Sequence, residues 1–416
     1  MSGYVGNKKS VSFVSAELPI RKGIESIVEE DGSYRLLDGA SLKKSDGSPV
    51  IHSDGTIDGV DLSPIQNQID SIEADITSLN SSIDMVEASL PSHSMNFRNR
   101  IINGDMRIDQ RNGGTAITVN GSYTVDRFRA FCPAGTFITQ QVSVSGTNAP
   151  NEFDKCIKIN VTSGSAPSSA QGGGFVYKIE GNDVYDFDLG LASAKTFTLS
   201  FWAKASRTGT YCCGLQSDGS DRSYVFEYEL TADVWSKITE TISGDITGTW
   251  LSDNGIGLDV RWSIGAGSDA TASPDQWVDS SSVTTGKFQT SNQVALQTLG
   301  GDFSITGVQL EEGTVATPFE HRPISVELSL CERYWRWGKF KVGGRATTGS
   351  GNRDNIFFST TMRVHPTVAL FNEVKNGIGT TRPEISEPNH FTVYWLGSVN
   401  SDTTTYYGEY SADAEL

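Results

Sequence analysis

The sequence predicts a mainly β protein in which a trimeric parallel coiled-coil stalk precedes a jelly-roll-like β-sandwich and a C-terminal β tip module. Three observations predict this fold class. A heptad repeat runs without a slip from Leu62 to Leu90. Short runs of alternating polar and apolar residues, separated by turns rich in Gly, Ser and Asp, fill the chain from about residue 96 onward. The length of 416 residues exceeds one compact domain and suits several modules.

Residues 1–60 are polar and rich in turn signals. Asp-Gly pairs recur along this segment, at Asp31, Asp38, Asp46, Asp54 and Asp58. The apolar pieces between them are too short to build a large core. We therefore expect an attachment segment that gains its stability from a partner or from trimerisation.

Residues 61–91 are expected to form the stalk. Its apolar a and d positions form a trimer seam made of Leu62, Ile65, Ile69, Ile72, Ile76, Leu79, Ile83, Val86 and Leu90. A period of 3.5 residues gives a left-handed coiled coil, and Ile at both a and d favours three strands over two. Ser63 can cap the helix, Pro64 suits its first position and Pro91 ends it. The alternative is a single amphipathic helix packed on a globular core.

The rest of the chain divides into two β regions. Residues 96–322 contain alternating strand-like runs such as Thr196–Ala203 and Leu258–Ile264, which predict a two-sheet sandwich. Residues 323–416 contain further runs, such as Phe391–Leu396, and are expected to form a compact second module. The predicted order is attachment segment, stalk, sandwich and tip.

Charge and cysteine usage exclude several classes of protein. The net charge is −17, and a trimer would carry three times that, so nucleic-acid binding is disfavoured. The five cysteines are odd in number and lack metal-ligand spacing, so we expect buried free thiols and a reducing compartment. No signal-peptide core and no stretch of membrane-spanning length is present, so neither export by a cleavable signal nor membrane insertion is expected.

Motifs for catalysis or cofactor binding are lacking. No nucleophile elbow, P-loop, dinucleotide fingerprint or zinc spacing occurs, and the five histidines stand singly. We expect no catalytic residues, no cofactor and no metal. The composition of Ser217–Asp221 could suggest a calcium-binding loop, but the spacing of its oxygen ligands is incomplete and a solvated turn is favoured.

The tip contains the candidate glycan contacts. The run from Arg333 to Lys341 combines basic and aromatic residues and could stack on sugars or bind anions, but a strand with its aromatics in the core is favoured. Two later clusters mix rings with hydrogen-bonding groups near turns, as sugar sites require. The candidates are Asn389, His390, Tyr394, Trp395, Tyr406 and Tyr407. For Trp395 the alternative is a place between strands in the tip core.

Three stretches resemble the tail fibre and receptor-binding proteins of tailed bacteriophages. They are Asn99–Arg111 with the following Tyr123–Phe128, Gly307–Tyr334, and Met362–Val368. The opening Met1–Asn7 is also similar to the start of such fibres.

The resemblance implies a homotrimer of the virion that is assembled in the host cytoplasm. Residues 1–60 would dock onto a tail, baseplate or adaptor protein. The sandwich would be similar to carbohydrate-binding modules, and the distal end would bind a host surface glycan such as lipopolysaccharide or capsule. We expect a non-enzymatic adhesin. The alternatives are a tail-borne glycan depolymerase on the same scaffold and a secreted cellular carbohydrate-binding protein, which the missing signal peptide disfavours.

The motif residues also have structural interpretations. The sequence Asn103-Gly104-Asp105 predicts a tight turn whose polar side chains bond the backbone. Asp126 and Arg127 are expected to form a buried ion pair, and Glu311 and Glu320 are expected to fix loops at the sandwich edge. These structural roles are favoured over catalytic ones.

Overall fold

A computed structural model describes residues 26–28, 34–36, 42–43, 49–51, 63–89, 97–119, 121–132, 134–283 and 286–416 of the chain. The chain divides into two compact units, Met1–Met85 and Val86–Leu416. The described elements are mainly strands in antiparallel sheets, as the sequence predicts. In the described part, no helix is both long and apolar enough to cross a membrane.

The first unit contains two small hairpins and most of a long helix. The hairpins pair β1 (Ser26–Val28) with β2 (Tyr34–Leu36) and β3 (Leu42–Lys43) with β4 (Pro49–Ile51). The helix α1 spans Ser63–Ser89, so it begins at the predicted cap and ends before Pro91.

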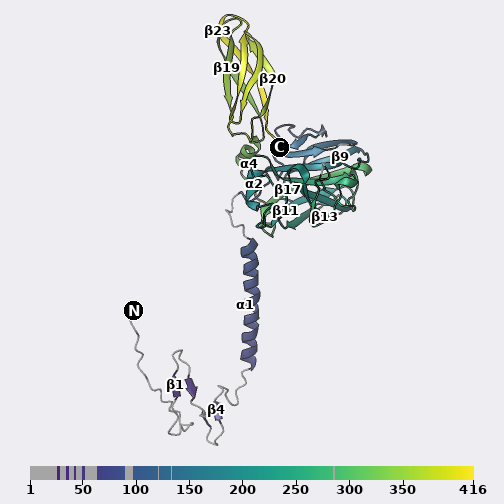
Figure 1. The fold of residues 1–416 in the computed structure, drawn as a ribbon, viewed down its shortest axis with the longest axis vertical. Helices are drawn as coiled ribbons and strands as arrows, with labels where there is room; N and C mark the ends of the chain where they lie inside the picture. The colour runs from purple at the N-terminus through teal and green to yellow at the C-terminus, as the bar shows by residue number, and fades with distance from the viewer. Residues whose placement is uncertain are drawn as a thin grey trace, which may run out of the picture. The chain divides into compact units, whose positions relative to one another are not determined.

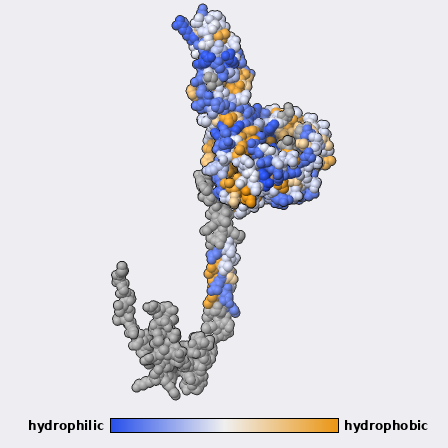
Figure 2. Space-filling model, viewed as in Figure 1, coloured by the Kyte–Doolittle hydropathy of each residue, from blue (hydrophilic) through white to orange (hydrophobic). Residues whose placement is uncertain are grey.

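The apolar seam of α1 is open to solvent in the single chain. Ile69, Ile72, Ile76 and Leu79 are 43% to 62% exposed, so no core of the same chain covers them. Figure 2 shows hydrophobic side chains on the helix surface beside hydrophilic ones. Leu62 and Leu90 lie outside the described residues, as do the side chains of Ile65, Ile83 and Val86. The single chain therefore shows the helix but not the predicted coiled coil.

The second unit contains a sandwich of two antiparallel sheets (Figure 1). The seven-stranded sheet has the order β16 (Trp277–Asp279), β13 (Arg222–Leu230), β12 (Gly209–Gln216), β15 (Ile256–Ala266), β10 (Gly172–Glu180), β7 (Phe128–Phe131) and β6 (Tyr123–Val125). The six-stranded sheet has the order β14 (Ser236–Ile242), β11 (Phe197–Ala205), β17 (Gly301–Glu312), β9 (Lys155–Ser163), β8 (Thr136–Ser143) and β5 (Ile117–Thr118).

One hydrophobic core joins the inner faces of these sheets. On β15, Leu258, Val260, Trp262 and Ile264 alternate with polar residues and are buried in this core, because successive strand residues point to opposite faces. The ring of Phe201 on β11 lies 5.7 Å from that of Trp262, centroid to centroid, at a near-perpendicular angle. The pattern of short alternating runs thus predicted the two-sheet architecture correctly.

Short helical turns connect the strands of the sandwich. They are α2 (Gly181–Val184), η1 (Tyr185–Phe187), η2 (Asp218–Ser220), η3 (Ser268–Ala270) and α3 (Leu296–Leu299). The helix α4 (Ile324–Glu332) follows the sandwich and leads into the last strands. Its Cys331, together with Tyr334, packs against Ile102 and Ile108 in a small separate core.

The last strands form two three-stranded antiparallel sheets, here called the C-terminal module (Figure 1). One sheet has the order β18 (Trp335–Ala346), β23 (Ser401–Asp413), β20 (Thr367–Asn376), and the other β19 (Gly351–Phe357), β22 (His390–Gly397), β21 (Ile378–Glu387). Phe391 of β22 packs on Tyr410 of β23 with their centroids 4.9 Å apart. Gly338 leaves room for this core, since a Cβ there would lie 2.6 Å from the Tyr410 hydroxyl.

Candidate functional site

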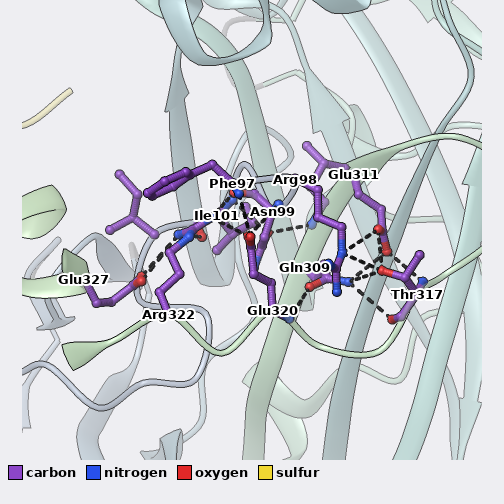
Figure 3. A network of polar contacts seen from close by, with 12 residues as sticks. Phe97, Arg98, Asn99, Ile101, Gln309, Glu311, Thr317, Glu320, Arg322 and Glu327 are labelled. Carbon is purple, nitrogen blue, oxygen red and sulfur yellow. Dashed lines mark hydrogen bonds and ion pairs between the residues drawn. The ribbon is translucent and has the colours of Figure 1, made fainter. Parts of the chain in front are cut away.

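The first motif stretch is bound to β17 and the segment after it (Figure 3). The carboxylate of Glu320 accepts hydrogen bonds from the backbone amides of Phe97 (2.6 Å) and Asn99 (3.0 Å). The Asn99 side chain donates to the carbonyl of Val308 (3.1 Å) and accepts from the amide of Leu310 (3.0 Å). Segments more than 200 residues apart in the sequence are thereby joined.

Glu311 also joins segments of the chain through hydrogen bonds that its carboxylate accepts. It accepts hydrogen bonds from the Thr317 amide (2.9 Å) and from the side chain of Gln309 (2.8 Å), and Arg98 lies 3.4 Å away (Figure 3). Its oxygens are therefore engaged by loop residues rather than directed at a ligand. The structural role predicted for Glu311 and Glu320 is confirmed by these contacts.

The turn at Asn103-Gly104-Asp105 is also structural. The Asn103 amide group donates to the carbonyls of Ile108 (2.8 Å) and Asp126 (3.0 Å). A Cβ on Gly104 would overlap the carbonyl oxygen of Val308, so only glycine fits this close approach. The predicted turn with side-chain-to-backbone bonds is confirmed.

The predicted ion pair between Asp126 and Arg127 is wrong. Asp126 accepts a hydrogen bond from the Gln110 amide (3.2 Å) and lies 3.7 Å from the guanidinium of Arg111. Arg127 is paired instead with Glu415, near the end of the C-terminal module. The two neighbours sit in a turn and point to different partners. Burial outweighs the nearby Arg111 and raises the pKa of Asp126 to about 6.

Two of the predicted glycan contacts lie in the core of the C-terminal module. Trp395 is buried and donates from Nε1 to Oδ2 of Asp354 at 2.7 Å. Tyr406 is buried and donates from its hydroxyl to Glu373. Rings enclosed on both sides cannot stack on a ligand, so these two predictions are corrected. The core position that the sequence left open for Trp395 is the one observed.

Three of the remaining candidates gather on the outer face of the β19-β22-β21 sheet. The Tyr394 ring lies between the guanidinium groups of Arg382 (4.3 Å) and Arg353 (5.4 Å). His390 lies beside the exposed ring of Phe357, with centroids 5.4 Å apart, and Asn389 occupies the preceding turn. Both guanidinium groups also donate to the carboxylate of Glu384, so the surroundings of the Tyr394 ring are already occupied by paired charges.

Tyr407 lies on the outer face of the β18-β23-β20 sheet, which is more open. The cross-strand register places Tyr407 between Lys341 and Val374, and it places Ser411 between Trp337 and Ala369. Trp337 is 41% exposed and Tyr407 46% exposed. Because Ser411 and Ala369 have small side chains, they do not cover the Trp337 ring, and the sheet beside it is open to solvent. We call this surface the open face.

Polar groups cross the middle of the open face. The Lys339 ammonium lies 5.4 Å from the centroid of the Trp337 ring and 3.6 Å from the carboxylate of Glu409. Asn372 donates to the same carboxylate at 2.8 Å. The face thus presents two aromatic rings separated by hydrogen-bonding groups that already hold one another in place, and this arrangement suits a hydroxyl-rich ligand.

The aromatic residues of the Arg333–Lys341 run were expected in the core, so Trp337 was not among the predicted contacts. The structure divides this run by strand alternation: Arg336 and Phe340 point inward, whereas Trp337 and Lys339 point outward. The sequence does indicate an outward position for Trp337, because alternation along a strand places it on the same side as Lys339 and Lys341.

Reactive groups are few in the described part of the chain. The five cysteines are free thiols, and all but Cys132, which is half-buried, are buried as expected. Burial raises the pKa of Cys156 and of Cys212 to about 11, so these thiols are unreactive. Among the residues that the structure describes, no three His, Cys, Asp or Glu side chains lie together in a way that could hold a metal ion.

Comparisons with known proteins assign no family. No protein-family model matches the chain, and no curated protein matches it. Solved structures with a similar arrangement of strands include the enzymatically active domain of tailspike protein 4 from bacteriophage CBA120. This match has 11% identity and a TM-score of 0.26, and it covers 52% of this chain and 21% of that chain.

Two further likenesses are of the same order. A xylan-binding CBM22-1 domain from Paenibacillus barcinonensis is 8% identical, with a TM-score of 0.25, and the match covers 49% of this chain and 99% of that chain. An arabinose-bound α-L-arabinofuranosidase is 11% identical, with a TM-score of 0.27, covering 49% and 26%. TM-scores this low do not establish a common fold.

Proposed function

We propose that this protein is a homotrimeric tail fibre protein of a bacteriophage that binds a host cell-surface glycan through its C-terminal module. The observation that carries the proposal is the open face, where Trp337 and Tyr407 remain exposed beside Lys339, Glu409 and Asn372. Exposed rings stack on the C–H faces of sugars, and neighbouring charged groups bond the hydroxyls. The resemblance of three sequence stretches to tail fibre proteins supports the same function.

Self-association is supported by α1. Four of its seam residues, Ile69, Ile72, Ile76 and Leu79, stay exposed in the single chain, although burying such side chains gains about 1.5–3 kcal/mol each. A parallel trimer would cover them and bring three copies of the C-terminal module into one assembly. Three equal sites can raise weak single-site affinity by roughly 10²–10⁴-fold when all engage together.

The deciding experiment measures binding of the full trimer to a panel of purified lipopolysaccharides and capsular polysaccharides, and to host cells. We expect Trp337→Ala and Tyr407→Ala to lower the apparent affinity by at least roughly tenfold. Their unfolding should be unchanged to within about 0.5 kcal/mol, because both rings are on the surface. Phe357→Ala on the other sheet is the matched control, since it also removes an exposed ring. Loss of binding in Phe357→Ala alone would move the site to that sheet.

The same polysaccharides separate an adhesin from a depolymerase. We propose an adhesin, so prolonged incubation should release no new reducing ends. Their appearance with wild-type protein would instead assign the protein to the tail-borne glycan hydrolases, which need a pair of carboxylates across a sugar-sized gap.

Attachment to the virion is assigned to residues 1–60. A truncated chain that begins at residue 61 should still trimerise and bind cells, because the stalk and the C-terminal module are intact. It should be missing from assembled particles. Incorporation of the truncated fibre at normal levels would show that another segment docks onto the tail.

A further inference from the structure

Two tryptophans meet at the edge of the sandwich, outside the C-terminal module. Trp277 lies on the edge strand β16, opposite Tyr224 of β13, and Trp250 lies in the loop between β14 and β15. Their ring centroids are 5.3 Å apart and the rings are perpendicular, at 86°. Both rings pack partly on the sandwich core and are partly exposed. Together they form an aromatic corner on the rim of the seven-stranded sheet.

The aromatic corner is held by the loop that carries Trp250. Trp277 donates from Nε1 to the carbonyl of Ser243 (2.7 Å), and Trp250 donates from Nε1 to the carbonyl of Thr247 (3.0 Å). Asp245 fixes this loop by a bidentate ion pair with Arg222, at 2.5 and 3.1 Å. The indole N–H groups are therefore used for orientation, and what the rings offer outward is their faces and edges. Rings fixed in this way lose little freedom on binding.

The surroundings of the aromatic corner are apolar on one side. The Gly190 amide donates to the carbonyl of Asp245 (2.7 Å), so the segment around Gly190 runs beside the Trp250 loop. The next residue of each segment, Leu191 and Ile246, carries an exposed apolar side chain. A sugar placed on the indoles would find further C–H contacts there.

The other side is acidic. Tyr224, whose ring centroid lies 5.4 Å from that of Trp277, donates from its hydroxyl to Glu240 at 3.1 Å. Burial, with a contribution from Asp275, raises the pKa of Glu240. Asp279 faces Arg222 across the same strand pair. Arg222 is paired with Asp245, whereas the carboxylates of Glu240, Asp275 and Asp279 would repel an anionic ligand.

We propose that the aromatic corner of Trp250 and Trp277 is a second carbohydrate site, which takes a neutral pyranose and uses Glu240 to accept a hydrogen bond from a sugar hydroxyl. Perpendicular indoles contact a pyranose on one face and along one edge, and acidic neighbours favour neutral sugars over uronic acids and sialic acids. The site lies on the sandwich, so it does not depend on the receptor that the C-terminal module binds.

The test isolates this site by removing the other. The full-length double variant Trp337→Ala/Tyr407→Ala is applied to an array of defined neutral and acidic oligosaccharides, and Trp250→Ala is then added. We expect the double variant to keep binding to neutral oligosaccharides, and Trp250→Ala to lower that affinity about tenfold, the effect of losing one stacking ring. Trp250→Phe retains an aromatic face and should restore most of it.

Three results would overturn the proposal. They are the absence of neutral-oligosaccharide binding by the folded double variant, unchanged binding after Trp250→Ala, and a residual signal confined to acidic oligosaccharides. Trp250 is only partly buried in its loop, so Trp250→Ala should fold, and thermal unfolding confirms this in each case. If the open face fails its own test while this one succeeds, the glycan contact belongs to the sandwich.

Discussion

The guanidinium of Arg333 forms a bidentate ion pair with the carboxylate of Glu180, with Nη2 donating to Oε1 at 2.6 Å and Nε to Oε2 at 2.9 Å. Glu180 ends the sandwich strand β10, and Arg333 precedes the first strand of the C-terminal module. Tyr334 donates to the same carboxylate at 2.8 Å. Burial alone would raise the pKa of Glu180, but the hydrogen bonds from Arg333, Asn182 and Tyr334 outweigh it and the pKa is lowered.

Glu180→Gln should therefore destabilise the junction by about 2 kcal/mol at pH 7, a usual value for hydrogen bonds to a buried charged group. A carboxyl group with a lowered pKa contributes stability above its ordinary value of 4.5, and this is lost as the pH falls through the lowered pKa. Urea titrations at pH 7 and pH 3 should show the difference shrinking in acid. Glu384→Gln, which removes the partner of the exposed Arg353, is the control and should leave the stability essentially unchanged.

Asp126 should show the opposite dependence on pH. Its pKa of about 6 in the folded protein lies above the ordinary value of 3.8, so folding favours the protonated form. The stability contributed by the protonated carboxyl group is fully present below pH 3.8 and is lost as the pH rises to 6. The loss amounts to about 2–3 kcal/mol. Asp126→Asn removes this titration. The stability of wild type relative to the variant should fall between pH 4 and 6 and then level off; a parallel pair of curves would contradict it.

The seam of α1 predicts the assembly state. Ile69→Asp together with Ile76→Asp places charges at two a positions and should convert the trimer to monomer, because an unpaired buried charge costs several kcal/mol. Light scattering of the full chain measures the mass directly. Ala74→Asp with Ser81→Asp adds the same charge outside the seam and should remain trimeric. A wild-type monomer or dimer would refute the stalk.

Core and surface aromatics of the C-terminal module should respond differently to truncation. Trp395→Ala removes a buried indole and should cost about 3–5 kcal/mol of stability. Tyr407→Ala should leave the unfolding curve in place, since its ring is on the open face. Thermal unfolding of the two variants is sufficient to compare them. Equal destabilisation by both would show that Tyr407 supports the fold.

Local repeats explain what the sequence could predict. The heptads of α1 and the alternation of β15 depend only on spacing, so helix bounds and strand faces follow from them. Two of the six glycan candidates, Trp395 and Tyr406, lie in the core; each belongs to a pair of adjacent aromatic residues, for which spacing alone does not tell which ring points inward. On β23, Tyr407 shares its side with Glu409 and Ser411, whereas Tyr406 shares its side with Tyr410 and Ala412. Whole alternating series therefore distinguish core from surface better than single residues do.

Contacts across long separations could not be predicted in the same way. Arg127 pairs with Glu415, 288 residues further along the chain, and nothing in the spacing of either residue indicates it. The nearest carboxylate in the sequence, Asp126, was the natural choice and was wrong. The short strand β16, which carries Trp277, depends in the same way on its pairing with β13, and the spacing of its own residues does not indicate it.

The C-terminal module is fastened at both its beginning and its end. Trp335, the first residue of β18, pairs with Asp413, the last residue of β23, and the Ala414 amide then donates to the carbonyl of Tyr334 at 2.7 Å. Beyond them Arg333 and Glu415 hold the sandwich separately. A pull on a ligand at Tyr407 would therefore reach the sandwich through two neighbouring strands, each followed or preceded by its own ion pair. A single flexible linker would let the C-terminal module rotate freely. Attachment through both its first and its last strand restricts that rotation relative to the sandwich.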